Sequence, residues 1–140
     1  MKQYHPRTIA EQRYDELAIY TLSLGDPEFI HQYAVDAFAA QTATEQTKPV
    51  TITFALIGLY LHLEKGYTGR AVHLAHMELA KRGKDWPRFS LPQTRGTVTV
   101  IEVLHAAPGA QRNDMITIWS ASVWDAYDAV HHQVQTLWYH

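Results

Sequence analysis

The chain of 140 residues contains no cysteine. This absence excludes disulfide bridges, thiolate zinc sites, iron–sulfur clusters and thiol nucleophiles. The sequence also lacks a glycine-rich phosphate loop, a dinucleotide-binding fingerprint, and the HExxH and GxSxG motifs. No motif of an enzyme class is therefore present, and the sequence leaves open whether the protein is an enzyme.

Long apolar runs are lacking as well. The longest, residues 50–63, is interrupted by Gly58 and His62, and it is shorter than the roughly 20 apolar residues that cross a bilayer. Residues 1–7 contain no apolar segment of the kind found in a secretory signal. We therefore expect a cytoplasmic protein without a membrane partner.

The composition is that of one ordinary globular domain. Hydrophobic residues make up 46% of the chain, and 12 Lys and Arg against 14 Asp and Glu give a net charge of −2. A chain of this length buries close to ~70% of the surface that its unfolded form exposes, so it needs no metal or disulfide to fold. We expect a single domain over residues 1–140.

Glycine and proline divide the chain into segments of helical length. Capping signals at Thr8, Pro27, Pro49, Thr68 and Thr99 each precede apolar residues spaced three and four apart. These signals predict helices that begin near 9, 27, 49, 69 and 100, and the first four end near 24, 43, 65 and 82. We expect an all-α fold, a compact helical bundle of five to six helices.

Two segments of the chain are less regular. Residues 84–98 contain Trp86 and Phe89 and are too apolar for a free linker, so we expect a partly structured loop packed on the bundle. Residues 97–103 are β-branched enough for a strand, but a lone strand has no partner, and a helix is favoured. Asn113 or Asp114 is expected to cap one long last helix over about 115–138.

Histidines on apolar helix faces are the candidate metal ligands. His31, His62 and His131 lie on three different predicted helices, and His76 is a substitute from a fourth. Neutral imidazoles bind zinc, iron or nickel, and three of them with an open position would activate a water molecule. If the histidines converge inside the bundle, they form a divalent metal site.

Other side chains are expected to shape a pocket near these histidines. Gln41 lies near the middle of an apolar face, and Tyr60 and Trp124 supply aromatic walls. On an ideal helix Asp36 and Gln32 fall on the opposite, solvent-facing side. The resulting interpretation is a His- and aromatic-lined pocket for a small molecule or a divalent metal.

The small and polar stripe Thr51, Ala55, Gly58 and His62 allows two explanations. It either lines that pocket or simply lets a neighbouring helix approach closely.

Two further interpretations belong to other classes of function. The helix over 49–65 is apolar on all sides, which suits either the centre of the core or the interface of a homodimer. The Trp-rich last helix is the other surface that a second subunit could cover. Residues 65–95 carry seven Lys and Arg against Glu78 and Asp85. This basic segment could bind phosphate, but without a recognised nucleic-acid motif we expect no nucleic-acid partner.

Several segments together resemble a bacterial family of unknown function, number 5946. They are Asp26–Pro27 with His31, and residues 35–41, 56–61, 86–87, 96–100 and 119–124. The resemblance covers about residues 15–135 and implies a small bacterial protein without an assigned activity. It also makes Asp36 a candidate ligand-binding residue beside Gln41, although the helical face calculation turns Asp36 towards solvent.

Overall fold

The computed structural model describes residues 7–140, and within them every regular element is helical. The predicted all-α fold is confirmed. The elements are α1 (Ile9–Ser23), α2 (His31–Thr42), α3 (Pro49–Lys65), α4 (Gly69–Lys81), α5 (Val100–His105), α6 (Ala110–Ala126), a 3₁₀ turn (Asp128–Val130) and α7 (His131–Tyr139). The prediction about a secretory signal concerns residues 1–6, which lie outside the described residues.

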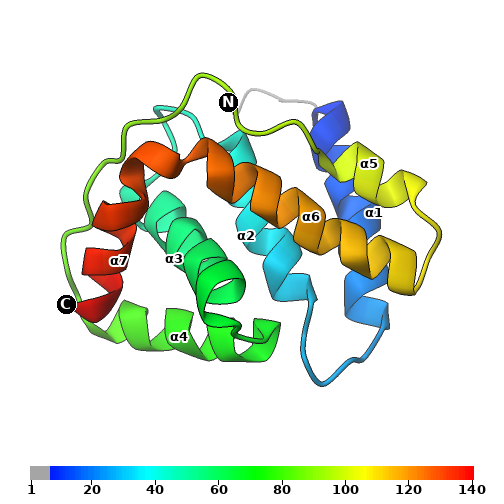
Figure 1. Cartoon of the computed structure of the whole chain (residues 1–140), viewed down its shortest axis with the longest axis horizontal. Helices are drawn as coiled ribbons and strands as arrows, with labels where there is room; N and C mark the ends of the chain where they lie inside the picture. Colours follow the sequence, from blue (N-terminus) through cyan, green and yellow to red (C-terminus); the bar gives the residue numbers. More distant parts are fainter. Residues whose placement is uncertain (1–6) are drawn as a thin grey trace, which may run out of the picture.

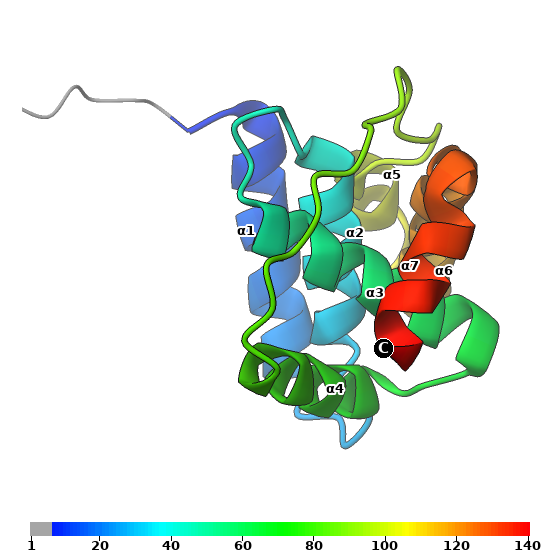
Figure 2. The same cartoon turned by 90° about the vertical axis from the view of Figure 1, so that its left-hand side faces the viewer.

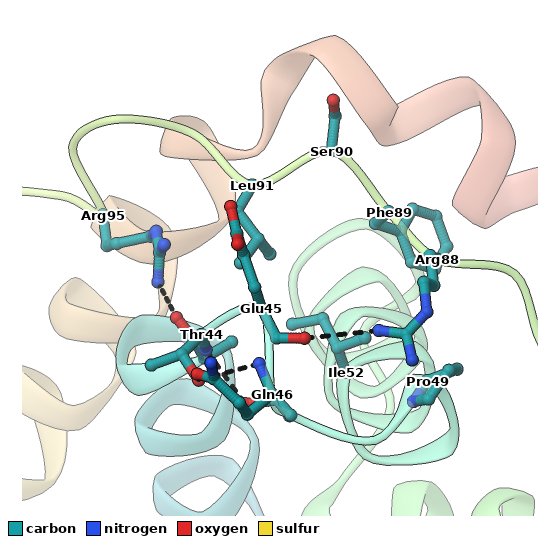
Figure 3. A pocket seen from close by; sticks show the side chains of 12 residues that line it. Thr44, Glu45, Gln46, Pro49, Ile52, Arg88, Phe89, Ser90, Leu91 and Arg95 are labelled. Carbon is teal, nitrogen blue, oxygen red and sulfur yellow. Dashed lines mark hydrogen bonds between the residues drawn. The ribbon is translucent and has the colours of Figure 1, made fainter.

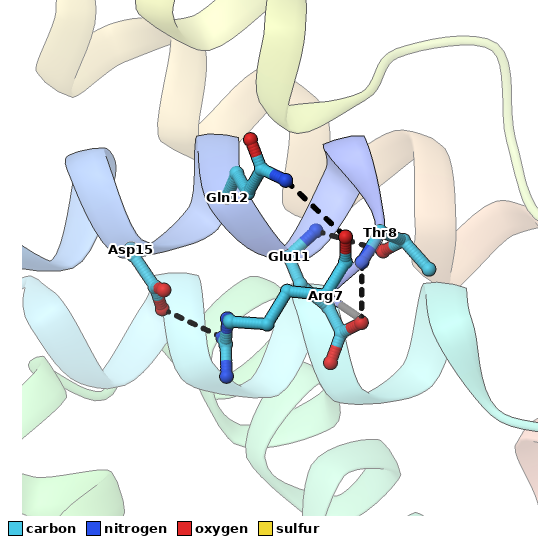
Figure 4. Close-up of polar contacts among 5 residues, drawn as sticks. All are labelled: Arg7, Thr8, Glu11, Gln12 and Asp15. Carbon is cyan, nitrogen blue, oxygen red and sulfur yellow. Dashed lines mark hydrogen bonds and ion pairs between the residues drawn. The ribbon is translucent and has the colours of Figure 1, made fainter. Parts of the chain in front are cut away.

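α1 begins where its capping signal predicts (Figure 4). The Glu11 amide donates to Thr8 Oγ1 at 3.1 Å, and the Thr8 amide donates to the Glu11 carboxylate at 2.9 Å. Arg7 adds an ion pair with Asp15 across two turns. The two bonds between Thr8 and Glu11 satisfy amides that an isolated helix end leaves unpaired. Gly25, with φ +58°, follows the end of the helix.

α2 begins later than predicted, at His31 instead of Pro27. The Asp26 carboxylate accepts a bond from the Ile30 amide at 3.0 Å, and Phe29 adopts a left-handed φ of +55°, which a continuous helix does not allow. This turn packs against the start of α4, where a Cβ at Gly69 would lie 1.9 Å from the Phe29 carbonyl oxygen. Tertiary packing therefore overrides the local start signal.

α2 and α3 form the centre of the molecule (Figures 1 and 2). α2 contacts α1, α3, α4 and α6, and α3 contacts α2, α4, α6 and α7. Most of the apolar residues of α3 are thus buried by helices of the same chain, whereas Val50 at its start is exposed. The core location anticipated for this helix is confirmed.

The connection between α4 and α5 runs along the outside of the bundle, as both views show (Figures 1 and 2). Phe89 is buried, and Trp86, Leu91 and Val98 pack on the core from this loop. Thr99 then caps α5 with Glu102 as the reciprocal partner. The predicted packed loop and the predicted short helix are both confirmed.

The prediction of one long last helix is wrong in two respects. α6 begins at Ala110, not after Asn113, whose side chain accepts a bond from the Tyr20 hydroxyl at 2.7 Å. The chain then breaks near Tyr127, where the His131 ring bonds to the Trp124 carbonyl at 2.8 Å. This break turns α7 towards α3, and it accounts for the one helix beyond the predicted five to six.

None of the helices in residues 7–140 combines the length and the apolar character that crossing a membrane requires.

Candidate functional site

A hollow of about 260 Å³ lies between α2, α3 and α4. We call it the Asp36 pocket. Its polar side chains come from all three helices: Gln32 and Asp36 from α2, Thr51 from α3, and His76 from α4. Its apolar walls are Val35, Ala39, Val50, Phe54 and Ala55.

Asp36 is the most deeply buried polar side chain of this pocket, with 3% of its surface exposed. Its Oδ1 atom accepts a hydrogen bond from Gln32 Nε2 at 3.1 Å, one helical turn away. The prediction that Asp36 and Gln32 face solvent is wrong, because α2 is covered on several sides and has no broad solvent face. Both residues instead line the pocket.

Gly58 on α3 makes room for the Asp36 carboxyl group. A Cβ atom at position 58 would lie 1.9 Å from Asp36 Oδ2 and 3.1 Å from His76 Nε2. The stripe of small residues on α3 therefore brings α2 close, and through Thr51 and Ala55 it also borders the Asp36 pocket, which is not the predicted pocket of His31, His62 and His131.

His76 is held in one orientation beside this carboxyl group. Its Nε2 atom lies 2.8 Å from the Phe54 carbonyl oxygen, which can only accept, so Nε2 carries the ring proton. Nδ1 is then free to accept from Gln32 Nε2 at 3.4 Å. Burial lowers the pKa of His76 to about 4, against the opposing effect of the Phe54 carbonyl, so the ring is neutral at pH 7.

The pocket leaves the Asp36 carboxyl group without a counter-charge from the chain. Burial raises the pKa of Asp36 well above its usual value, and the Gln32 hydrogen bond opposes this only in part. Among residues 7–140, no lysine or arginine forms an ion pair with it, and the nearest basic nitrogen is His76 Nε2 at 3.8 Å. A neutral imidazole supplies no positive charge there.

The three histidines predicted as metal ligands have separate environments. His31 bonds to the Thr21 hydroxyl at 2.8 Å, and His62 stacks on Tyr33 at 3.4 Å between ring centres. His131 stacks on Trp124. Across residues 7–140 no three histidine, aspartate or glutamate side chains are grouped so that they could hold a metal ion.

Tyr60 and Trp124, the predicted aromatic walls, lie against each other away from the Asp36 pocket. The Tyr60 and Trp124 rings lie 6.2 Å apart, and the Trp124 and His131 rings 3.7 Å apart. The Trp124 indole donates to Glu64 at 2.7 Å. This cluster therefore joins α3, α6 and α7, and its polar groups already have partners within the chain.

Gln41 ties three parts of the fold together. Its Nε2 atom donates to the Arg95 carbonyl at 3.0 Å and to the Val98 carbonyl at 2.8 Å. Its Oε1 atom accepts from the Trp119 indole at 2.8 Å. The side-chain amide thus links α2, α6 and the long loop, and these bonds explain its position on an apolar face.

A second hollow, of about 790 Å³, lies where residues 43–49 face residues 88–95 (Figure 3). Arg88 donates to the Glu45 carbonyl on one side, and Arg95 donates to the Ala43 carbonyl on the other. Arg95 also bonds to the Pro92 carbonyl at 2.9 Å. These guanidinium groups of the basic segment hold the two loops together.

Sequence reasoning missed Gln32 and ranked His76 below the other histidines. Two signals pointed to the pocket: α2 carries almost no charge between Pro27 and Thr44, so it can be covered on two sides, and Gly58 opens space on the facing helix. Neither signal indicates which residue of α4 would lie beside Asp36 and Gly58.

The chain belongs to a family of unknown function (DUF5946), whose family model matches residues 11–128. The matched range contains all the residues of the Asp36 pocket. No curated protein and no solved structure matches the chain.

Proposed function

We propose that the protein binds a small organic molecule in the Asp36 pocket, with Asp36 as its main polar contact and Gln32 and His76 beside it. The observation that carries this proposal is a buried carboxyl group, next to a neutral imidazole, at the wall of a hollow that is otherwise mainly apolar. Ligand sites combine apolar walls with a few convergent polar groups and a titratable residue of shifted pKa in this way.

The size and the donor set favour an organic ligand over a metal ion. The hollow of about 260 Å³ is close to the lower limit of ligand pockets, roughly 300 Å³. Asp36 and His76 would supply only two metal ligands, whereas a zinc site uses three or four protein ligands. Buried polar groups are also costly unless paired, so a ligand that pairs with Asp36 recovers part of that cost.

Binding can be tested with a panel of small alcohols, amines and carboxylates observed by NMR. We expect saturable shifts of backbone amides on α2, α3 and α4 around the pocket. The Ala39→Phe variant fills the half-buried rim of the pocket and should weaken binding at least about tenfold. Ala80→Phe, on the exposed side of α4 and outside the pocket, is the matched control. Equal binding by both variants would contradict the proposal.

A homodimer is the second candidate, and exposed apolar side chains on α1 favour it. Ile19 is 72% exposed and Leu22 56% exposed, although both are large hydrophobic residues. Sedimentation at micromolar concentration should then give a dimer, and Ile19→Glu should give a monomer. Gln133→Glu, at an exposed position of α7, controls for the same change of one negative charge. A monomeric wild-type protein would rule this candidate out.

A further inference from the structure

The hydrogen-bond donors of Gln32 and His76 in the Asp36 pocket are already used within the protein, and the Thr51 hydroxyl is the remaining side-chain donor of the lining. The Gln32 side-chain amide donates to Asp36 Oδ1 and to His76 Nδ1. The ring proton of His76 goes to the Phe54 carbonyl. A ligand that needs donors, such as a carboxylate or a phosphate, therefore finds few of them there.

The hydrogen-bond acceptors of the pocket are used less completely than its donors. In the ionised form that pairs with a cation, a carboxylate has about four acceptor positions, and Gln32 fills one of those on Asp36. The other oxygen, Oδ2, faces Gly58, which has no side chain to pair with it. Asp36 thus retains acceptor capacity at the pocket wall, where a donor group of a ligand can use it.

The charges around the pocket also favour a ligand that donates hydrogen bonds to Asp36. Its lining contains one acidic residue and neither lysine nor arginine. On α1, burial raises the pKa of the Tyr14 phenol to about 12, and the charge of the Asp36 carboxylate adds to this shift, so Tyr14 is uncharged at pH 7. The titratable neighbours on α1 and α4, Tyr14 and His76, therefore leave the carboxyl group unneutralised.

We propose that the ligand is a small protonated organic amine whose nitrogen pairs with Asp36. This inference rests on the proposed function and specifies its ligand class. The ammonium group donates to the carboxylate and supplies the missing positive charge, and such charge-assisted bonds are about twice as strong as neutral ones. The carbon skeleton lies against Val35, Ala39 and Val50, and the Phe54 ring adds an attraction for the cation.

The test compares ligands of the same shape and different charge. Butylamine and cyclopentylamine are the ammonium probes, butanol and cyclopentanol the uncharged probes, and butyrate and cyclopentanecarboxylate the anionic ones. We expect the amines to bind at the pocket at least about tenfold more tightly than the matched alcohols at pH 7. The carboxylates should cause no shifts there.

The Asp36→Asn variant separates charge from shape. Asparagine has the size of aspartate and keeps an acceptor for Gln32, so the variant should remain folded, which its NMR spectrum checks. It should bind the amines at least about tenfold more weakly and the alcohols almost unchanged. Asp128→Asn removes an exposed carboxylate, 91% accessible, and should leave amine binding unchanged.

The possible outcomes distinguish the two proposals. If the alcohols bind as tightly as the amines, or if Asp36→Asn keeps full amine affinity, the ligand class is wrong and the pocket remains a binding site. If no probe of any charge shifts the pocket amides, both proposals fail. Both proposals are supported if the amines bind more tightly than the other probes and if Asp36→Asn and Ala39→Phe each remove this preferential binding.

Discussion

The Asp36 carboxyl group occupies the space that a side chain at Gly58 would fill, with Oδ2 only 1.9 Å from the position of a Cβ atom there. One residue on α2 and one on α3 thus fit together at the centre of the fold. The close approach of these two helices depends on a residue without a side chain beside a buried acid.

Gly58→Ala should destabilise the protein, although alanine is the better helix former by about 1 kcal/mol. The added methyl group must displace the carboxyl group or push α2 away, and overpacking of this kind costs about 1–3 kcal/mol. Urea denaturation followed by circular dichroism measures the change in unfolding free energy.

The double variant Asp36→Ala with Gly58→Ala provides the control for this explanation. Removing the carboxyl group makes room for the methyl group, so Gly58→Ala should cost less in the Asp36→Ala background than in the wild type. Equal costs in both backgrounds would mean that some other contact of Gly58 is responsible.

His62 should make the protein sensitive to acid. Burial lowers its pKa to about 4, and its Nδ1 atom has no hydrogen-bond partner within residues 7–140. Between the unfolded pKa of 6.5 and this value the unfolded chain binds more protons, so stability is complete above pH 6.5 and falls as the pH decreases towards 4. One such group contributes on the order of 2 kcal/mol over this range.

The His62→Phe variant should reduce that loss of stability, because phenylalanine can stack on Tyr33 and does not titrate. Thermal or urea unfolding at several pH values between 7 and 4 gives the comparison. His132→Phe, at an exposed position of α7, is the control and should retain the wild-type slope. A His62→Phe protein with the same acid sensitivity as the wild type would contradict this assignment.

Gln41→Ala should destabilise the fold by about 2–3 kcal/mol, because it removes three hydrogen bonds to groups of limited solvent access. Relative to the wild type, amide hydrogen exchange should become faster in the loop around Val98 and stay unchanged in α4. Gln133→Ala, at an exposed position of α7, should change stability by less than about 0.5 kcal/mol. Unchanged stability in Gln41→Ala would show that the loop is held by its apolar contacts alone.

The metal hypothesis for His31, His62 and His131 has a direct test. Because the three imidazoles have separate partners, we expect the untagged protein to contain less than stoichiometric zinc, iron or nickel. Elemental analysis of the purified protein measures this. A stoichiometric metal that is lost in all three single His→Ala variants would overturn our expectation and establish the site.

Local sequence signals predicted several parts of the fold well. The capping box at Thr8, Pro49 at the start of α3 and Thr99 before α5 each place a helix start. Such signals act between residues a few positions apart, so they can be read without knowing the fold. The same local logic failed at Pro27, because the turn there is held by contacts with α4.

The candidate site could be predicted only in part. Asp36, Gln41 and the histidines were recognisable as unusual polar residues on weakly charged helices, but the face calculation assumed one solvent side for each helix. That assumption fails for α2, which four other helices cover. The sequence therefore could not predict that Asp36 bonds to Gln32 and lies beside His76.

The amino-acid sequence alone determined the helical class, most of the helix boundaries and the packed loop, since these depend on backbone propensity, caps and apolar spacing. Only the tertiary structure decided which imidazole meets the buried carboxyl group and which helices surround it. Burial and pairing depend on residues far apart in the chain, and their distances are set by the packing of all the helices at once.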